Sequence, residues 1–165
     1  MRTFLLMVIV TLSATIIKAE PVFSFDFNDH PEEKCLALNI YFEARGSILA
    51  DKAGVADVVM NRVRDSRYPD TICKVVKQGY KHPNGAMKRH KCQFSWYCDG
   101  KSDTPADLDR WYEAQTIAWF MSKADKFRSI TEGATHYHAD YVEPSWAESL
   151  QIIGKIGTHI FYRWE

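Results

Sequence analysis

Apolar residues recur at helical spacing through most of the chain, and the period changes to two near its end. The helical spacing predicts four helices, over about residues 32–44, 50–63, 71–78 and 104–121. Two of them open on a proline in the first turn, at Pro31 and Pro105. Alternation predicts two antiparallel strands, over about residues 134–138 and 158–162. The pattern is therefore that of an α+β domain, mostly helical, with a small antiparallel sheet near the C-terminus.

The N-terminus departs from this pattern. Arg2 precedes a short apolar run, and Ala19 offers a cleavage point. This arrangement predicts a secretory signal over residues 1–19, because the run is too short to span a bilayer comfortably. An uncleaved membrane anchor is the alternative, since Ile17 is larger than the small residue usually found there. We interpret residues 20–33 as a flexible lead and residues 34–165 as one domain, which we expect to be monomeric.

Charge and cysteine content narrow the class of protein. The chain has 21 basic and 21 acidic side chains, so its composition gives no reason to expect a nucleic-acid partner. All four cysteines follow the predicted signal, and an even number in an exported chain predicts two disulfides. Of the three possible pairings we favour Cys92 with Cys98 and Cys35 with Cys73. A zinc site is the competing use of cysteines, but the sequence contains no Cys-x-x-Cys pair.

The stretch from Lys77 to Lys91 contains glycines and a proline that predict a loop. It also holds several cations and no acid: Lys77, Lys81, Lys88, Arg89 and Lys91. A run of this kind is usually a solvated surface, and its other use is contact with an anionic polymer.

Glu43 is the first candidate for chemistry. On a helix it falls beside Leu36, Asn39 and Ile40, so its carboxyl is expected to point inward or into a cleft. Loss of hydration would raise its pKa and let it carry a proton near neutral pH, as a general acid must. The structural alternative is a solvated carboxylate at a helix end near Arg45.

Two further groups of side chains are candidates for binding. The aromatic segment Gln93-Phe94-Ser95-Trp96-Tyr97 lies between two cysteines and suits a sugar ring, although its rings would serve equally well as core residues. His136 and His138 share a strand face, and His159 on a partner strand could complete a three-histidine zinc site.

Several motifs together resemble the SleB-type cell-wall hydrolases, the family of the spore cortex-lytic enzymes. They span about residues 35–163 and read Ile40-Tyr41-Phe42-Glu43-Ala44-Arg45-Gly46, Val55 to Val63, Tyr68-Pro69, Cys92-Gln93-Phe94-Ser95-Trp96, Ala134-Thr135-His136-Tyr137-His138-Ala139, Tyr141-Val142 with Pro144 and Trp146, and Gly157-Thr158-His159 with Phe161-Tyr162. Each motif is weak alone, and the ordered set is specific.

The resemblance implies a lysozyme-like domain that cuts peptidoglycan glycan strands between N-acetylmuramic acid and N-acetylglucosamine. The family's catalytic glutamate matches Glu43. Members are similar to lytic transglycosylases, in which one carboxyl serves as acid and then base and leaves a 1,6-anhydro end. By the same resemblance, the sugar-binding cleft would include Gln93, Phe94, Ser95, Tyr137 and His138, with no cofactor and no metal.

Other functions stay open from the sequence alone. Ordinary hydrolysis would need a second carboxylate, for which Asp99 and Glu132 are the candidates. A zinc-dependent wall hydrolase would use His136, His138 and His159, and a non-catalytic glycan-binding module would use none of these groups chemically. The chain also departs from the family pattern, with Ser47 where an acid is common, a long loop over residues 77–91 and no separate wall-binding repeat. In each case we expect an exported protein at the cell wall, with peptidoglycan as its partner.

Overall fold

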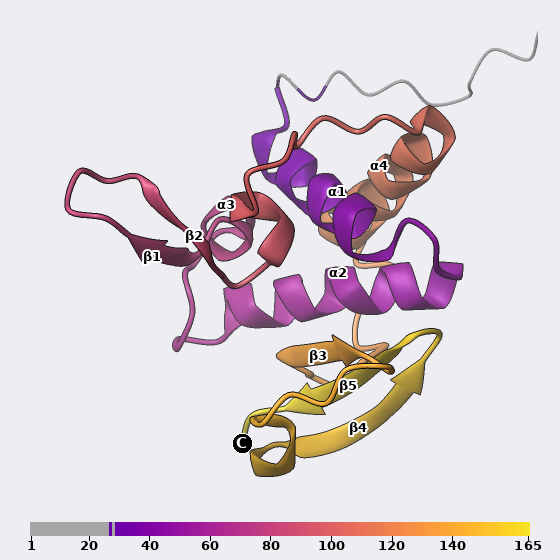
Figure 1. The fold of residues 1–165 in the computed structure, drawn as a ribbon. Coiled ribbons are helices and arrows are strands. Elements are labelled where there is room, and N and C mark those ends of the chain that lie inside the picture. Colours follow the sequence, from indigo (N-terminus) through magenta and orange to yellow (C-terminus); the bar gives the residue numbers. More distant parts are fainter. Residues whose placement is uncertain (1–26, 28) are drawn as a thin grey trace, which may run out of the picture.

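The structure is a computed structural model that describes residue 27 and residues 29–165. The predicted signal and most of the predicted lead lie outside the described residues. The helices are α1 (Pro31–Ala44), α2 (Leu49–Arg64), α3 (Ile72–Val76) and α4 (Leu108–Lys123), with short 3-10 helices η1 (Ser95–Cys98) and η2 (Ala147–Ser149). The strands are β1 (Gly79–Lys81), β2 (Met87–Cys92), β3 (His136–Ala139), β4 (Gln151–Ile156) and β5 (His159–Arg163). The predicted α+β fold with a C-terminal sheet is confirmed (Figure 1).

Helix α2 is the middle layer of the domain. Figure 1 shows α1 and α4 side by side on one side of it, and the sheet of β3, β5 and β4 on the other. Its small and β-branched residues are fully buried from Ala53 to Val59, as the apolar run predicted. Within the described residues, no helix is both long enough and apolar enough to cross a bilayer.

The C-terminal sheet has the order β3-β5-β4, and all its pairs are antiparallel. Tyr137 lies opposite Phe161, and Ala139 lies opposite His159, so these residues share one face of the sheet. That face packs on α2, where the ring of Phe161 lies so close that a β-carbon on Gly54 would be 2.7 Å from it. Glycine is therefore what lets the sheet approach the helix.

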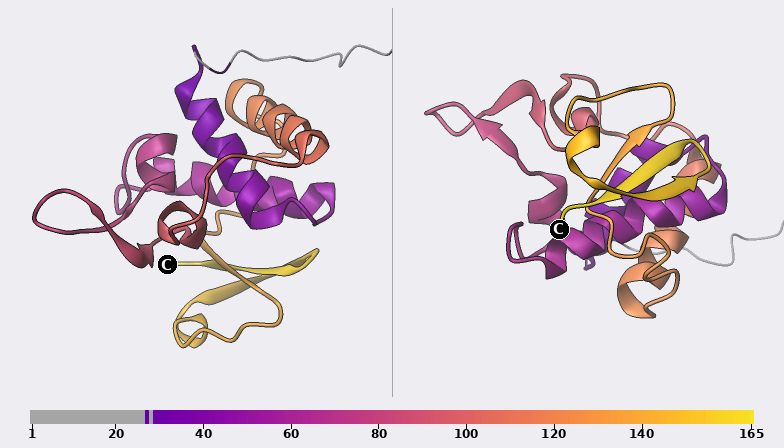
Figure 2. Two further views of the ribbon diagram at one scale, coloured as in Figure 1. Left: turned by 45° about the horizontal axis from the view of Figure 1, so that its top comes forward. Right: turned by 90° about the horizontal axis from the view of Figure 1, so that it is seen from below.

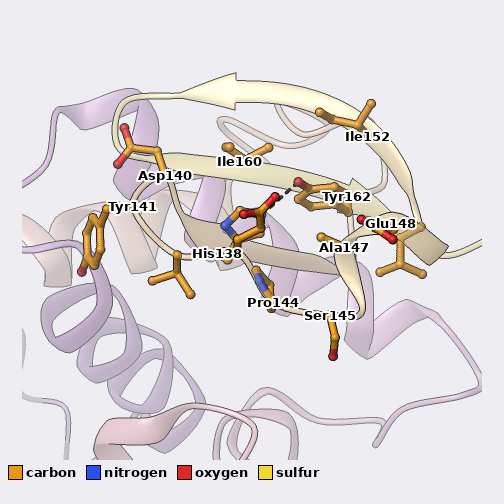
Figure 3. Close-up of a pocket in the computed structure, with 13 residues that line it drawn as sticks. His138, Asp140, Tyr141, Pro144, Ser145, Ala147, Glu148, Ile152, Ile160 and Tyr162 are labelled. Atoms are coloured by element: carbon orange, nitrogen blue, oxygen red, sulfur yellow. Dashed lines mark hydrogen bonds between the residues drawn. The ribbon is translucent and has the colours of Figure 1, made fainter.

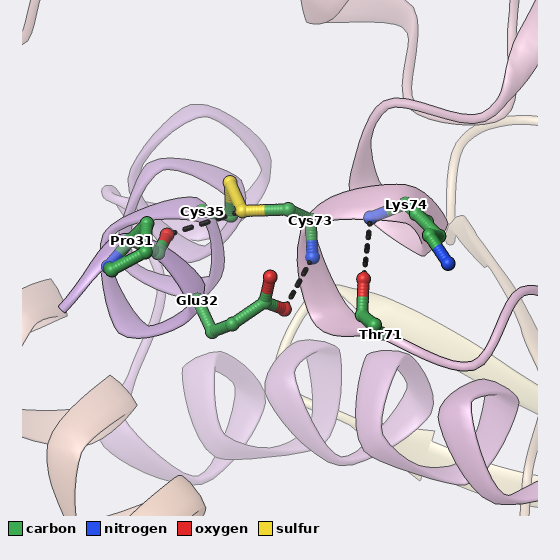
Figure 4. The surroundings of a disulfide bond; sticks show 6 residues. All are labelled: Pro31, Glu32, Cys35, Thr71, Cys73 and Lys74. Atoms are coloured by element: carbon green, nitrogen blue, oxygen red, sulfur yellow. Dashed lines mark hydrogen bonds between the residues drawn. A yellow bond between two sulfur atoms is a disulfide. The ribbon is translucent and has the colours of Figure 1, made fainter.

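Both favoured disulfides are present. Cys35–Cys73 joins α1 to α3, and Cys92–Cys98 closes the segment that contains η1. Beside the first bond the Cys73 amide donates to the Glu32 carboxylate at 2.9 Å, which fixes α3 against the first turn of α1 (Figure 4). The two bonds thus hold the Glu43 helix and the aromatic segment in place.

Three local predictions need correction. The expected loop over residues 77–91 contains the antiparallel hairpin of β1 and β2, which extends away from the helices (Figure 2). Its strands show no apolar alternation because most of their side chains are exposed. Strand β4 was not predicted, since Gly154 interrupts it at an irregular register. Helix α4 begins later than expected, where the Asp107 carboxylate accepts a hydrogen bond from the Arg110 amide and caps it.

Candidate active site

Glu43 lies in the last turn of α1 and is partly buried. The hydroxyl of Tyr137, on the inner face of β3, donates a hydrogen bond to its Oε2 at 3.2 Å. Burial raises the pKa of the Glu43 carboxyl above its ordinary value. The hydrogen bond from Tyr137 and the nearby His159 and Arg62 side chains act in the opposite direction and offset only part of that rise. The carboxyl can therefore hold a proton at a higher pH than a solvated glutamate, while its charged form is still supported.

The hydrogen bond comes from a tyrosine that stays protonated. Burial, together with the adjacent Glu43 charge, raises the pKa of Tyr137 well above its ordinary value. The hydroxyl proton is thus retained across the physiological range and is available to the Glu43 carboxylate.

Asn39 lies one helical turn before Glu43 and is fully buried. Its Oδ1 accepts a hydrogen bond from the indole Nε1 of Trp96 at 3.1 Å. Because an indole nitrogen only donates, this bond fixes the amide with Nδ2 directed elsewhere. The amide lowers the pKa of Tyr137, yet Nδ2 forms no hydrogen bond in the structure. Because an amide nitrogen does not accept hydrogen bonds, the Tyr137 hydroxyl donates to Glu43 and not to Asn39.

Two basic side chains face the carboxyl from other elements. Arg62 of α2 is buried between the rings of Tyr68 and Phe94, and its Nε donates to the Thr135 carbonyl at 2.7 Å. His159 of β5 is also buried, and its Nδ1 lies 2.7 Å from Oδ1 of Asp51. The His159 ring meets the Tyr137 ring edge to face at 5.0 Å. The site is thus built from α1, α2, β3 and β5, with Arg62 and the Asp51–His159 pair beside Glu43.

No second acid is among the described groups that shift the pKa of Glu43. Those that change the Glu43 pKa are Tyr137, His159 and Arg62. Asp99 instead lies 3.8 Å from Lys101, and Glu132 lies in the turn before β3, where its carbonyl accepts from Arg163. Within the part of the chain that the structure describes, neither candidate second carboxylate is among the groups that act on Glu43.

Comparison with known proteins now assigns the family. A family model described as "Cell Wall Hydrolase" matches residues 46–162. The chain belongs to the cell wall hydrolase family. The predicted resemblance to the SleB-type enzymes is therefore confirmed, and the chain is an enzyme that cleaves the cell wall. The match begins at Gly46, so the helix that carries Glu43 precedes it.

Solved structures show the same fold. The catalytic domain of the germination-specific lytic transglycosylase SleB from Bacillus anthracis is similar at 21% identity and a TM-score of 0.59, over 87% of this chain and 99% of that one. The catalytic domain of the Bacillus cereus SleB protein is similar at 21% identity and a TM-score of 0.55, over 81% of this chain and 91% of that one. A search among curated proteins gave no significant match.

The aromatic segment of this cell wall hydrolase divides into core and surface. Phe94 and Trp96 are buried, and Trp96 stacks on Phe42, the residue before Glu43, at 4.9 Å. Gln93 and Ser95 are exposed on the same segment. Of the predicted cleft residues, Tyr137 contacts Glu43 directly and Phe94 reaches the site through Arg62.

His138 lies elsewhere. It is on the outer face of the sheet, where its Nε2 is 2.9 Å from the Tyr162 hydroxyl (Figure 3). This pair lines a cavity of about 960 Å³ between the sheet and the loop that carries Trp146, and Glu43 does not line it. The structure therefore does not bring His138 together with Glu43.

The three histidines of the zinc hypothesis do not share a face. His136 and His138 lie on the outer face, whereas His159 lies on the inner face and is held by Asp51. Among the described residues no cluster of three or more His, Cys, Asp or Glu side chains has a metal-binding arrangement. The alternation of the strand, not the type of residue, separates the proposed ligands.

Sequence reasoning did not assign a role to Asn39, Arg62 or Asp51. Asn39 was recognisable only as a helical neighbour of Glu43, and no local pattern distinguishes a buried arginine from the exposed one that ends a helix. The available signal was that charged residues interrupt a helix predicted to be largely buried, namely Asp51, Asp57 and Arg62.

Proposed function

We propose that this enzyme cleaves peptidoglycan glycan strands between N-acetylmuramic acid and N-acetylglucosamine, as a lytic transglycosylase with Glu43 as its general acid and base. The observation that carries the proposal is the Glu43 carboxyl itself, raised in pKa by burial, bonded to Tyr137 and without an acidic neighbour among the groups that act on it. The likeness to a domain described as a lytic transglycosylase supports the same reaction.

The mechanism follows from one carboxyl used twice. Protonated Glu43 gives its proton to the glycosidic oxygen as the bond to the muramyl C1 breaks, and the sugar takes on oxocarbenium character. The resulting carboxylate is supported by the Tyr137 hydroxyl, Arg62 and His159. It then takes the proton of the muramyl C6 hydroxyl, whose oxygen bonds to C1. Glu43 is again protonated, no water is consumed, and the muramyl end is a 1,6-anhydro sugar.

Gln93 and Ser95 are proposed to line one side of the sugar-binding cleft and Tyr137 the other. The support is that the first two are exposed on the segment that packs beside Glu43 through Trp96 and Phe42. Phe94 contributes from beneath, as the ring over which the Arg62 guanidinium is held at 5.2 Å.

The test is mass spectrometry of the soluble products from purified peptidoglycan. We expect muramyl ends that are lighter by one water. Reducing muramyl ends would instead mean hydrolysis, with a second acid that comes near Glu43 only when substrate is bound. Glu43→Gln is expected to retain the fold, checked by circular dichroism, and to lose 10²-fold or more in activity, on the order of general acid catalysis. A Glu43→Gln enzyme that clears wall suspensions at the wild-type rate would remove Glu43 from the mechanism.

We also propose that the enzyme is exported and acts as a monomer at the wall. Two disulfides suit an oxidising compartment, and the apolar run after Arg2 suits a secretory signal. N-terminal sequencing of the protein recovered from the exported fraction tests this: a start at Glu20 is expected, whereas a start at Met1 in the membrane fraction would indicate an anchor.

A further inference from the structure

A second cavity lies where α3, the β1–β2 hairpin and η1 meet. Its volume is about 470 Å³, and its lining combines three lysines with apolar side chains: Lys74, Lys77 and Lys81 with Pro69, Met87 and Tyr97. We call it the lysine groove. Figure 4 shows Lys74 on α3, beside the Cys35–Cys73 bond.

The lysine groove is positively charged. No acidic residue lines it. Lys74 is paired with Asp70 at 2.8 Å, but within residues 29–165 neither Lys77 nor Lys81 forms an ion pair, and both are exposed. The adjoining strand β2 adds Lys88, Arg89 and Lys91 without an acid. Unpaired ammonium groups beside an apolar surface suit a ligand that carries carboxylates on a small apolar body.

The lysine groove is connected to the candidate active site by packed aromatic rings. Tyr97, which lines the groove, meets the ring of Trp96 at 5.9 Å. Trp96 in turn stacks on Phe42 at 4.9 Å, and Phe42 precedes Glu43. Helix η1 therefore lies between the groove and the residues beside Glu43.

We propose that the lysine groove binds the peptide stem of the peptidoglycan strand, with Lys77 and Lys81 pairing with its carboxylates and Met87 and Tyr97 contacting its alanyl methyl groups. The inference rests on the proposed function for its substrate. Stems hang from the lactyl group of muramic acid and carry free carboxylates, so the ligand is an acidic peptide attached close to the bond that is cut. The groove would then select strands that retain their stems.

The test compares two substrates with Lys77→Gln/Lys81→Gln. On intact soluble peptidoglycan fragments we expect KM to rise about three- to tenfold, the scale of two exposed ion pairs, with kcat unchanged. On glycan strands stripped of stems by an amidase, the variant and the wild type should have the same KM. The matched control is Lys126→Gln/Lys155→Gln, which removes equal charge from exposed positions after α4 and on β4, neither of which lines the groove, and should leave KM unchanged on both substrates.

An equal KM rise on stripped glycan, or the same rise in the control variant, would overturn the proposal in favour of general attraction to an anionic wall. Direct binding keeps this test separate from the reaction. Titration of a soluble stem tetrapeptide into the Glu43→Gln protein, followed by NMR, should shift the amides around Lys77 and Lys81 whether or not the glycan is cleaved. No shifts, or equal displacement of the peptide by inorganic polyphosphate, would contradict a stem site.

Discussion

The indole nitrogen of Trp96 donates to Oδ1 of Asn39 at 3.1 Å, and that one hydrogen bond determines which side of the amide faces Tyr137. The two residues are 57 positions apart in the chain, one on η1 and the other on α1. The amide beside Tyr137 is therefore oriented by a ring that comes from another element.

Removing the Asn39 amide should weaken the acid without changing the fold. Asn39→Leu removes the amide group beside the Tyr137 hydroxyl, so we expect that hydroxyl to be oriented less well toward Glu43 and kcat/KM to fall about tenfold, equivalent to about 1.4 kcal/mol. Trp96→Phe retains the stacking on Phe42 but frees the Asn39 amide, and we expect a fall of about threefold. A pH series of kcat/KM should show both substitutions as a change in the apparent pKa of the group that controls the rate.

The double variant separates orientation from packing. Because Trp96 acts through Asn39, Trp96→Phe should have no further effect in the Asn39→Leu background. Trp111→Phe, whose ring packs in the core against Phe27 and Tyr41, is the matched control and should leave the pH profile in place. Independent, multiplying effects would mean that Trp96 and Asn39 act only on stability.

Glu43 should destabilise the folded enzyme at neutral pH. Its folded-state pKa is raised, so the folded protein binds this proton more tightly than the unfolded chain does, and stability falls as pH rises from the unfolded pKa through the folded one. Glu43→Gln is always neutral, so at pH 7 it should unfold at a higher temperature than the wild type. Thermal melts below about pH 4, where the carboxyl is protonated in both states, should show no difference.

His136 should make the protein sensitive to mild acid. Burial, with Arg62 and Arg67 nearby, lowers its pKa to about 4. The unfolded chain takes up a proton near pH 6.5 that the folded protein does not, so stability is lost as pH falls from 6.5 towards 4. The full difference in pKa corresponds to about 3.4 kcal/mol, and solvent screening of this partly exposed ring reduces the expected loss to roughly 2 kcal/mol. His136→Gln should flatten this part of the stability curve measured by urea unfolding, and an unchanged slope would assign the loss to other groups.

The two disulfides should contribute differently. Cys35–Cys73 spans 38 positions and Cys92–Cys98 spans 6, so the loop-closure model gives losses of about 4 and about 2 kcal/mol when each pair is replaced by serines. Loss of the shorter bond should lower activity more than loss of the longer one, relative to the stability that each removes, because the shorter bond closes the segment that carries Trp96. Urea unfolding and kcat/KM on the same two variants check this, and the reverse ranking in activity would argue that η1 is held by its packing alone.

What the sequence could predict was decided by how local the information is. Glu43 and Tyr137 lie in strongly periodic segments, so the helix and the strand that carry them were predictable. The β1–β2 hairpin was not, because its exposed cations leave no alternating pattern. Arg62 was assigned no role, since its position depends on the Thr135 carbonyl, 73 positions away. The zinc hypothesis depended on register: His159 lies opposite Ala139, and a partner one residue along would have placed it on the face of His138.

Gly54 sets the spacing between α2 and the sheet, and the ring it admits belongs to Phe161, the residue opposite Tyr137. Glu43 and Tyr137 come from different layers of the domain, and their 3.2 Å hydrogen bond crosses the joint between them. The pKa of Glu43 therefore depends on the distance between α2 and the sheet. A methyl group at Gly54, on the side of α2 that faces the sheet, would push Phe161 and the sheet away from the helix. The hydrogen bond from Tyr137 to Glu43 would then weaken, although neither residue is changed.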